Sequence, residues 1–504
     1  MPRLLFIFSL LFTGLLRAQQ PDRWQPVRDS IRRQLVTQGV AAISVAVAKD
    51  GRILWEEGFG WANREKMIPA TPNTMFSLAS ISKPITATGL MVLVQRGQVN
   101  LDRPANDYLG AGKLTGLAGN AVEATVRRVA GHMAGLPLHY QFFYGNEAIR
   151  PPSMDETIAR YGILVSAPGE TFRYSNLGFG IIDYIISRVS GQSYPDFMRT
   201  EVFVPLGLTH TSVDIGPGLE PFAAERYDKH QRPIPFYTFD HNGGSAIYSS
   251  AHDLVRFGMF HLKDHLSDQR AILADSTLDQ MEKPNSARAF GTATYGIGWL
   301  IQPSDHGYRT VEHSGGMPGV QTALNLYPSE NLAIVVLTNS SSSRPDRIAE
   351  DIAAIVLPRY GDSLRAERSR PKNRPARPAF TAPAELLGSW TGTLRTWQSS
   401  VPLTLTVQPD GNALVQVGDP AKSELEARGD KQLRALLNDA HWEDKVLSGR
   451  FAGTITTPDA SRVAHTIAIE LRLVGGKLRG QANAESGVDP VYFSLASYVE
   501  LTRK

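Results

Sequence analysis

Residues 361–383 interrupt the chain and separate two regions of different character. The segment holds four prolines and six basic residues: Pro371, Pro375, Pro378 and Pro383, with Arg365, Arg368, Arg370, Lys372, Arg374 and Arg377. Proline restricts the backbone and like charges repel, so this composition predicts a semi-extended, solvated linker. A tether to an anionic surface is the alternative. The chain of 504 residues is too long for one typical domain, and we expect residues 20–360 and 384–504 to fold separately, each around its own core.

Strand-like segments lie at both ends of residues 20–360, with helical segments between them. The expected strands are 41–48, 53–60, 321–327 and 332–339, the first two joined by the turn signal Lys49-Asp50-Gly51-Arg52. Helical patterns occupy 24–37 and 344–357 and begin near Ser80, Thr125, Asp155 and Asn176. This order predicts a mixed α/β (α+β) region.

Residues 384–504 are instead a series of short alternating runs, which predicts an all-β domain. The expected strands are 403–407, 413–417, 433–437, 446–451, 466–473, 477–482 and 491–501. Asp410-Gly411 and Gly475-Gly476 are hairpin signals. Gly388-Ser389-Trp390 resembles the glycine-x-tryptophan of lipocalin-like barrels, and this many meandering strands suit an up-and-down barrel. A twisted sandwich is the alternative.

Charge and cysteine content exclude several classes of function. The formal net charge is +3, from 52 lysines and arginines against 49 acidic residues, so the chain has no general nucleic-acid footprint. It contains no cysteine, which excludes disulfides, thiolate catalysis and cysteine-ligated metals.

The N-terminus predicts export from the cytoplasm. A short positive segment, Met1-Pro2-Arg3, precedes an apolar run from Leu4 to Leu16 and a cleavage-like Ala18. This pattern is typical of a signal peptide over residues 1–18, and it implies a secreted or periplasmic protein. An uncleaved N-terminal anchor is the alternative. No other stretch is long and apolar enough to cross a bilayer, so no membrane span is expected after cleavage.

The most specific chemical signal is Ser80-Ile81-Ser82-Lys83, where a loop enters a helical run. Positions i and i+3 share one face of a helix, so the Ser80 hydroxyl and the Lys83 amine should lie together. A serine hydroxyl needs a neighbouring base to become a nucleophile, and a buried lysine kept neutral can be that base. A helix N-cap serine followed by a surface lysine is the alternative.

Two further elements follow in order. Tyr174-Ser175-Asn176 opens an apolar helical run, and His313-Ser314-Gly315-Gly316 lies between strand-like segments. The series Ser-x-x-Lys, Tyr-x-Asn, His-x-Gly resembles the serine beta-lactamase and penicillin-binding protein superfamily, in its class C-like branch. Residues 125–137 and 243–254 resemble further family segments, and the likeness covers about residues 25–357. It implies an antiparallel sheet flanked by helices plus a helical lobe.

The resemblance also implies roles. Ser80 would form an acyl-enzyme, and Lys83 and Tyr174 would handle protons, with either as the base. Asn176 would bind the substrate's acyl side or Lys83. Backbone N–H groups of Ser80 and Gly316 would form the oxyanion hole, and glycine at 315 and 316 would allow a close approach to the ligand.

His313 departs from the family pattern, because penicillin-recognising members carry lysine there. A histidine is mostly neutral at pH 7, which weakens attraction for a substrate carboxylate. An esterase or a D-amino-acid amidase or peptidase, acting on a small ester, amide or D-amino-acid peptide, is therefore preferred. A beta-lactamase or penicillin-binding carboxypeptidase, and a non-catalytic ligand- or cell-wall-binding protein, are the alternatives.

Other histidines carry weaker signals. His132 and His139 have no motif partner, so core or surface positions are expected. His261 and His265 have the i, i+4 spacing of helical metal ligands, but no third ligand is evident and a surface pair is expected. No metal or organic cofactor is implied.

Overall fold

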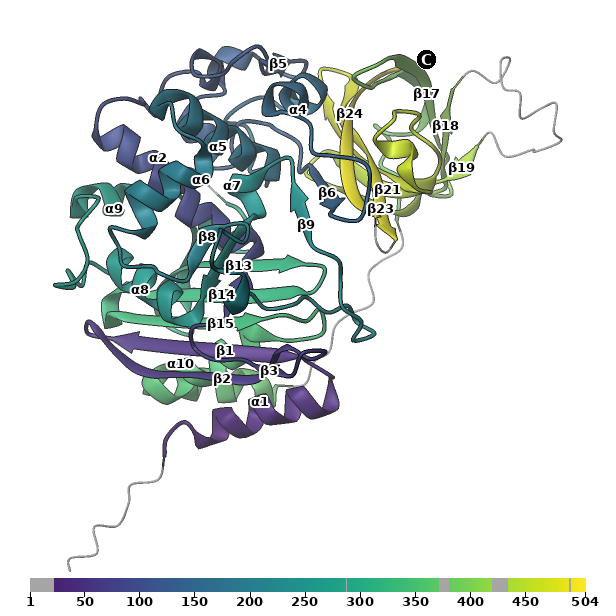
Figure 1. The fold of residues 1–504 in the computed structure, drawn as a ribbon. Coiled ribbons are helices and arrows are strands. Elements are labelled where there is room, and N and C mark those ends of the chain that lie inside the picture. Colours follow the sequence, from purple (N-terminus) through teal and green to yellow (C-terminus); the bar gives the residue numbers. More distant parts are fainter. Residues whose placement is uncertain (1–21, 287, 371–379, 419–433, 489–490) are drawn as a thin grey trace, which may run out of the picture.

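The computed structural model describes residues 22–286, 288–370, 380–418, 434–488 and 491–504 (Figure 1). The predicted signal peptide lies outside these residues. None of the helices within them combines the length and the apolar character that crossing a membrane requires.

An eight-stranded antiparallel sheet forms the base of the first region. Its order is β11-β12-β13-β14-β15-β1-β2-β3. The strands are β1 (Ala42–Lys49), β2 (Arg52–Asn63), β3 (Ile68–Pro69), β11 (Thr294–Tyr295), β12 (Leu300–Asp305), β13 (Tyr308–Met317), β14 (Val320–Tyr327) and β15 (Leu332–Thr338). β1 pairs with β15, with Ile43 opposite Thr338, so the two ends of the region meet in mid-sheet. The predicted antiparallel sheet is confirmed.

Helices cover both faces of this sheet. Side chains along β1 alternate between the two faces of the sheet. Ile43, Val45 and Val47 pack in one core with α1 (Gln25–Thr37) and α10 (Pro345–Val356). Ala42 and Ala46 join the other core, beneath α8 (Ala251–His261) and the helical lobe. Because successive strand residues point to opposite faces, this one strand serves two layers. Figure 1 shows α1 and α10 below the sheet and the lobe above it.

The lobe contains the helices expected near Ser80, Thr125, Asp155 and Asn176. They are α2 (Ser82–Gln95), α3 (Val126–Ala130), α4 (Met154–Tyr161) and α5 (Asn176–Ser190). Short helices α6 (Tyr194–Met198), α7 (Asn242–Ser245) and α9 (Asp275–Met281) complete it. Small strands join them: β4 (Met75–Ser77), β8 (Thr211–Val213) and β10 (Ile247–Ser250) in one sheet, with β5 (Thr115–Gly116) and β7 (Ile163–Leu164) in another.

Residues 384–504 form the expected all-β barrel, which is nearly closed. Its strand order is β19-β18-β17-β16-β24-β23-β22-β21-β20. The strands are β16 (Gly388–Arg395), β17 (Ser400–Val407), β18 (Ala413–Val417), β19 (Ala435–Leu436), β20 (Asn438–Glu443), β21 (Val446–Ala452), β22 (Thr466–Val474), β23 (Lys477–Val488) and β24 (Val491–Arg503). The expected strands are present, and β16 and β20 are additional. β20 was missed because Asn438-Asp-Ala-His-Trp-Glu443 is largely polar.

The barrel and the first region do not have separate cores, which corrects that expectation. β6 (Tyr140–Tyr144) pairs with barrel strand β24, with Gln141 opposite Phe493, and also with β9 (Tyr237–Phe239). Phe142, Tyr237 and Phe493 belong to one continuous hydrophobic core. An edge strand can recruit a partner from elsewhere in the chain, which local periodicity does not reveal.

The start of the expected linker is also different from the prediction. Residues 361–369 continue α11 (Pro358–Ser369), whose Arg368 pairs with Glu350 and Asp351 of α10 at 2.7 Å each. These pairs neutralise one of the repelling charges and support a helix. Residues 371–379 lie outside the described residues.

Candidate active site

Ser80 lies in a single 3-10 turn, η1 (Ala79–Ile81), immediately before α2. The preceding Ala79 has a left-handed φ of +49°, a strained conformation for a residue with a Cβ. The turn is held by the neighbouring strand β10, because Leu78 N–H donates to Ile247 O at 2.9 Å and Ile247 N–H donates to Ser82 Oγ at 3.0 Å. The tight turn therefore projects Ser80 from a rigid support.

Lys83 is fully buried one turn later, as the spacing predicts. Its Nζ lies 3.1 Å from Ser80 Oγ, 2.8 Å from Asn176 Oδ1 and 2.9 Å from Gly244 O. Burial lowers the pKa of Lys83 well below its ordinary value. A neutral amine has two protons and one lone pair. The two carbonyl oxygens can accept both protons, which leaves the lone pair directed at the Ser80 hydroxyl.

Tyr174 and Asn176 flank the N-cap of α5. The cap is Ser175, whose Oγ accepts the Gly178 N–H and donates to Pro137 O at 2.6 Å. Ser175 therefore has a structural role as a helix cap. The Tyr174 ring lies 4.7 Å from Lys83 Nζ. Burial raises the pKa of Tyr174, against a hydrogen bond with Ser80 that lowers it. The hydroxyl is therefore protonated near neutral pH.

His132 packs directly on Tyr174, with ring centroids 4.4 Å apart. Its Nδ1 accepts the Ser175 N–H at 3.1 Å, and burial lowers its pKa well below the ordinary value. His132 is thus a neutral core residue that supports the Tyr174 turn, in line with the expectation for a histidine without a motif partner.

His313 lies on β13 behind Tyr174, with both ring nitrogens engaged. Nδ1–H donates to Ser314 O at 2.7 Å, and Nε2 accepts from the Tyr295 hydroxyl at 3.0 Å. Burial, and next the charge of Lys83, lower the pKa of His313 to about 3. The ring is therefore neutral, and it is only 6% exposed. Tyr295, which no motif marked, fixes its orientation.

Gly315 and Gly316 bring β13 against the nucleophile turn. A Cβ on Gly315 would lie 2.1 Å from Leu78 O and 2.4 Å from Thr322 Oγ1, so this position admits only glycine. A Cβ on Gly316 would meet nothing closer than the Gln321 side chain at 3.5 Å. Close packing therefore requires glycine at 315 but not at 316.

A cavity of about 280 Å³ opens over Ser80. Of the predicted residues, Ser80, Asn176 and Gly316 line it. Lys83, Tyr174, His313 and Gly315 are not among its lining residues. Four aromatic or imidazole side chains that no motif indicated also line it: Tyr140, Phe142, His241 and, from barrel strand β24, Tyr492. The barrel thus contributes directly to the cavity over Ser80.

A buried cluster lies next to this cavity. Asp240 accepts from His139 Nε2 at 2.9 Å and from His241 Nδ1 at 2.8 Å. Donor atoms of the three residues lie within 4.8 Å of one another, as a metal site would need, but both ring N–H groups already bind the carboxylate. His261 and His265 are not a surface pair, which corrects that expectation: His261 is buried against Thr88, and only His265 is exposed.

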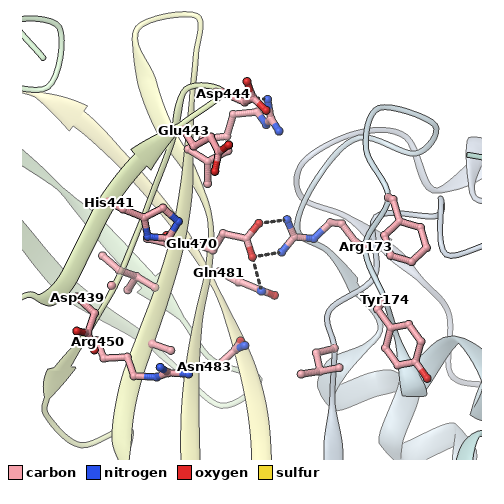
Figure 2. A pocket seen from close by; sticks show the side chains of 18 of the residues that line it. Arg173, Tyr174, Asp439, His441, Glu443, Asp444, Arg450, Glu470, Gln481 and Asn483 are labelled. Carbon is pink, nitrogen blue, oxygen red and sulfur yellow. Dashed lines mark hydrogen bonds and ion pairs between the residues drawn. The ribbon is translucent and has the colours of Figure 1, made fainter. Parts of the chain in front are cut away.

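A larger cavity of about 680 Å³ lies between the barrel and the catalytic region, beside Tyr174 (Figure 2). Arg173 crosses it and binds Glu470 of β22 through two hydrogen bonds of 2.6 and 3.0 Å. Gln481 Nε2–H donates to the same carboxylate at 3.3 Å. The buried Oε1 of Gln481 has no hydrogen-bond partner among the described residues. Figure 2 shows these polar side chains on the barrel strands facing Arg173 and Tyr174.

This interdomain cavity is negatively charged. Three arginines line it, each paired with a carboxylate: Arg173 with Glu470, Arg450 with Glu485 and Arg472 with Glu170. Asp439, Glu443 and Asp444 also line it, and within the described ranges none has an ion pair. The cavity therefore favours cationic groups.

The arrangement matches known proteins in sequence. The family profile described as Beta-lactamase matches residues 27–357. Penicillin-binding protein 4* of Bacillus subtilis (strain 168) is 28% identical over 322 residues, which cover 59% of this chain and 67% of the relative. Protein flp of Staphylococcus aureus (strain MRSA252) is 24% identical over 339 residues, 66% of each chain. The matches thus span about two thirds of each relative.

Solved structures share the fold. The octameric penicillin-binding protein homologue from Pyrococcus abyssi superposes with a TM-score of 0.58 at 22% identity, covering 93% of this chain and 99% of that one. A class C beta-lactamase superposes with a TM-score of 0.56 at 21% identity, over 66% of this chain and 96% of its own. The first likeness includes the barrel as well as the catalytic region.

Proposed function

The chain belongs to the beta-lactamase family, whose profile matches more than half of its length, and we propose that it hydrolyses small esters or amides through an ester at Ser80. One observation carries the proposal. A buried lysine of lowered pKa lies 3.1 Å from a serine hydroxyl at the edge of a cavity. This combination activates a nucleophile and serves no packing purpose.

In acylation, Ser80 Oγ attacks the substrate carbonyl carbon and its proton passes to Lys83. The tetrahedral oxyanion forms near the backbone N–H groups of Ser80 and Gly316, two residues that line the cavity. The Tyr174 hydroxyl then relays the proton to the leaving alcohol or amine, and the bond to that group breaks. The raised pKa of Tyr174 suits a donor better than a base. We therefore assign Lys83 as the base of this step.

The charges around the site support a substrate without a carboxylate next to the reacting carbonyl. His313 is neutral and both its nitrogens are occupied, so it offers no cation there. The negative interdomain cavity beside Tyr174 suits a free amino group. These features favour an amidase or peptidase acting on D-amino-acid derivatives, with simple esters as further substrates.

Two alternatives make different predictions. A beta-lactamase or penicillin-binding carboxypeptidase would process substrates that carry a carboxylate. A non-catalytic binding protein would form no covalent adduct. Secretion to the periplasm or beyond, and the division into residues 20–360 and 384–504, remain predictions.

Covalent labelling tests the proposal. A fluorophosphonate should add to the wild-type protein with one adduct mass, mapped to Ser80 by peptide sequencing, and Ser80→Ala should remove it. A panel of short-chain esters, D-amino-acid amides and a chromogenic cephalosporin then ranks the substrate classes. The matched control is Ser175→Ala, which changes a serine of the Tyr-x-Asn element. An adduct on Ser175, or none on any serine, would reject the assignment.

A further inference from the structure

Hydrolysis of the Ser80 ester needs a base for the attacking water, and Lys83 is badly placed to be that base. Its Nζ already has three neighbours, at Ser80 Oγ, Asn176 Oδ1 and Gly244 O. Lys83 does not line the Ser80 cavity. A water that approaches the ester from the cavity therefore has no direct path to the Lys83 lone pair.

Among the described residues that line this cavity, His241 is the strongest base. The other ionisable side chains there are tyrosines, and burial raises the pKa of Tyr140 to about 12. A neutral phenol accepts a proton poorly, whereas a neutral imidazole accepts one readily.

His241 is also held in the required tautomer. Its Nδ1–H donates to Asp240 Oδ1 at 2.8 Å, so the lone pair is on Nε2. That Nε2 is buried and has no hydrogen-bond partner within the described part of the chain. A buried polar atom without a partner is uncommon and points to a missing water or ligand group. Burial lowers the pKa of the ring, so the free base is present at neutral pH.

The ring lies close to the catalytic groups. A Cβ built on Gly244 would be 3.3 Å from His241 Cδ2 and 3.2 Å from Asn176 O. Gly244 O is the same carbonyl that binds Lys83. Nε2 is bonded to Cδ2 in the ring, so this edge of the imidazole lies next to Gly244, whose carbonyl binds Lys83.

We propose that His241, oriented by Asp240, is the general base for hydrolysis of the Ser80 acyl-enzyme. This inference rests on the proposed function. Water oxygen bonds to the acyl carbon while its proton moves to His241 Nε2, and the oxyanion collapses. The bond from carbon to Ser80 Oγ then breaks, Ser80 Oγ takes a proton from the Lys83–Tyr174 pair, and the carboxylic acid leaves. The Lys83–Tyr174 pair is then one proton short, and the proton held by His241 returns to that pair through solvent, which restores the starting state. The carboxylic acid ionises separately after release.

The test separates the two half-reactions. His241→Gln should leave the rate of Ser80 acylation by a p-nitrophenyl ester within about threefold of wild type. Hydrolysis of the adduct should slow by about 10²-fold or more, the usual effect of losing a general base. The acyl-enzyme should then accumulate in intact-mass spectra. Asp240→Asn should also slow hydrolysis of the adduct, because it disturbs the tautomer of His241.

His139→Gln is the matched control, since His139 binds the same carboxylate but does not line the cavity. We expect it to retain fast hydrolysis. Hydroxylamine provides a readout that a structural defect would not change: it attacks esters without a general base, so it should restore turnover in His241→Gln far more than in wild type.

The outcomes distinguish the two proposals. An adduct at Ser80 that hydrolyses equally fast in wild type and His241→Gln would overturn the role of His241 and leave the proposed function intact. Equal loss in His139→Gln and His241→Gln, without hydroxylamine rescue, would also overturn it. If wild type forms no Ser80 adduct, the proposed function itself fails. If His241→Gln does not fold, the same comparison is made with Asp240→Asn: slow hydrolysis of the adduct that hydroxylamine restores supports the role of His241, and fast hydrolysis overturns it.

Discussion

At the scale of single residues, the site depends on a lysine that burial keeps neutral. Three polar atoms surround Lys83 Nζ among the described residues, and all three are uncharged oxygens. Neutral partners solvate the amine without stabilising an ammonium ion, so desolvation controls the pKa. The same side chain in solvent would be protonated and inert.

This environment predicts the pH dependence of acylation. The neutral lysine is the active form, so the rate should rise with pH and level off well below pH 10.5, the ordinary pKa of a lysine. Lys83→Met should slow acylation by about 10²–10⁴-fold, as expected for a lost general base. Stopped-flow acylation with a p-nitrophenyl ester measures both.

Lys83→Arg is the control, because arginine places a permanent cation at this position but cannot act as a base at these pH values. A comparable loss in both variants supports the neutral amine. Substantial activity in Lys83→Arg, or an acid limb centred near pH 10.5, would mean that the charge of Lys83 matters instead.

At the scale of elements, the site depends on β13 packing tightly on the nucleophile turn. Gly315→Ala would place a methyl group 2.1 Å from Leu78 O, so β13 or η1 must move. We expect a destabilisation of about 1–3 kcal/mol, typical of overpacking. Gly316→Ala has a 3.5 Å clearance and should cost less than about 0.5 kcal/mol. Urea unfolding of the two variants makes the comparison, and equal stabilities would contradict the packing.

A buried carboxyl on α5 supports the short helix α7, which carries Gly244. Asp183 accepts the Gly243 N–H at 2.6 Å, and burial raises its pKa from 3.8 to about 8. Below pH 3.8 the folded and unfolded states are both protonated at this group. As pH rises towards 8 the unfolded state gives up its proton first, so the folded state loses relative stability.

Asp183→Asn removes this pH dependence while keeping an oxygen that can accept the Gly243 N–H. We expect the melting temperature of the variant to exceed that of wild type by more than about 2 °C at pH 8.5, with a smaller difference at pH 5. Differential scanning calorimetry at the two pH values measures this. A difference that is largest at pH 5 would show that Asp183 is charged in the folded protein.

At the scale of the whole molecule, the barrel is part of the active region. It supplies Tyr492 to the Ser80 cavity and extends its sheet to β6. Arg462 of the barrel inserts at the same boundary, where it binds Glu147 at 2.6 Å and Phe142 O at 3.2 Å. Its side chain is only 5% exposed. Losing a chain segment beyond Tyr360 would therefore uncover β6 and remove part of the cavity wall.

Arg462→Ala should destabilise the protein by about 1–3 kcal/mol, because it leaves two partly buried acceptors without this donor. Arg450→Ala is the matched control: it removes a barrel arginine whose partner, Glu485, belongs to the barrel itself. Such an exposed pair contributes about 0–1 kcal/mol. Urea unfolding followed by tryptophan fluorescence compares them, and equal effects would argue that the two regions unfold independently.

The sequence alone determined the elements and the chemical motifs. Ser80 and Lys83 are close because helical geometry places i and i+3 on one face, and this local rule needs no tertiary information. Seven strands of the barrel follow from alternation and from glycine-containing turns in the same way, whereas β16 and β20 do not. Tyr174, Asn176, His313 and the two glycines were identifiable because their motifs are short and ordered.

The tertiary structure decided which other residues join them. His241 comes from residues near α7, Tyr140 from β6 and Tyr492 from β24, and no local pattern links these three positions. The same holds for the partners of Lys83 and His313. The Gly244 carbonyl of α7 reaches Lys83 on α2 through helix packing, and the Tyr295 hydroxyl of β11 reaches His313 across the sheet. Burial is the largest cause of the pKa shifts of Lys83, Tyr174, His241 and His313. Burial is a property of the packed chain, which periodicity along the sequence does not contain.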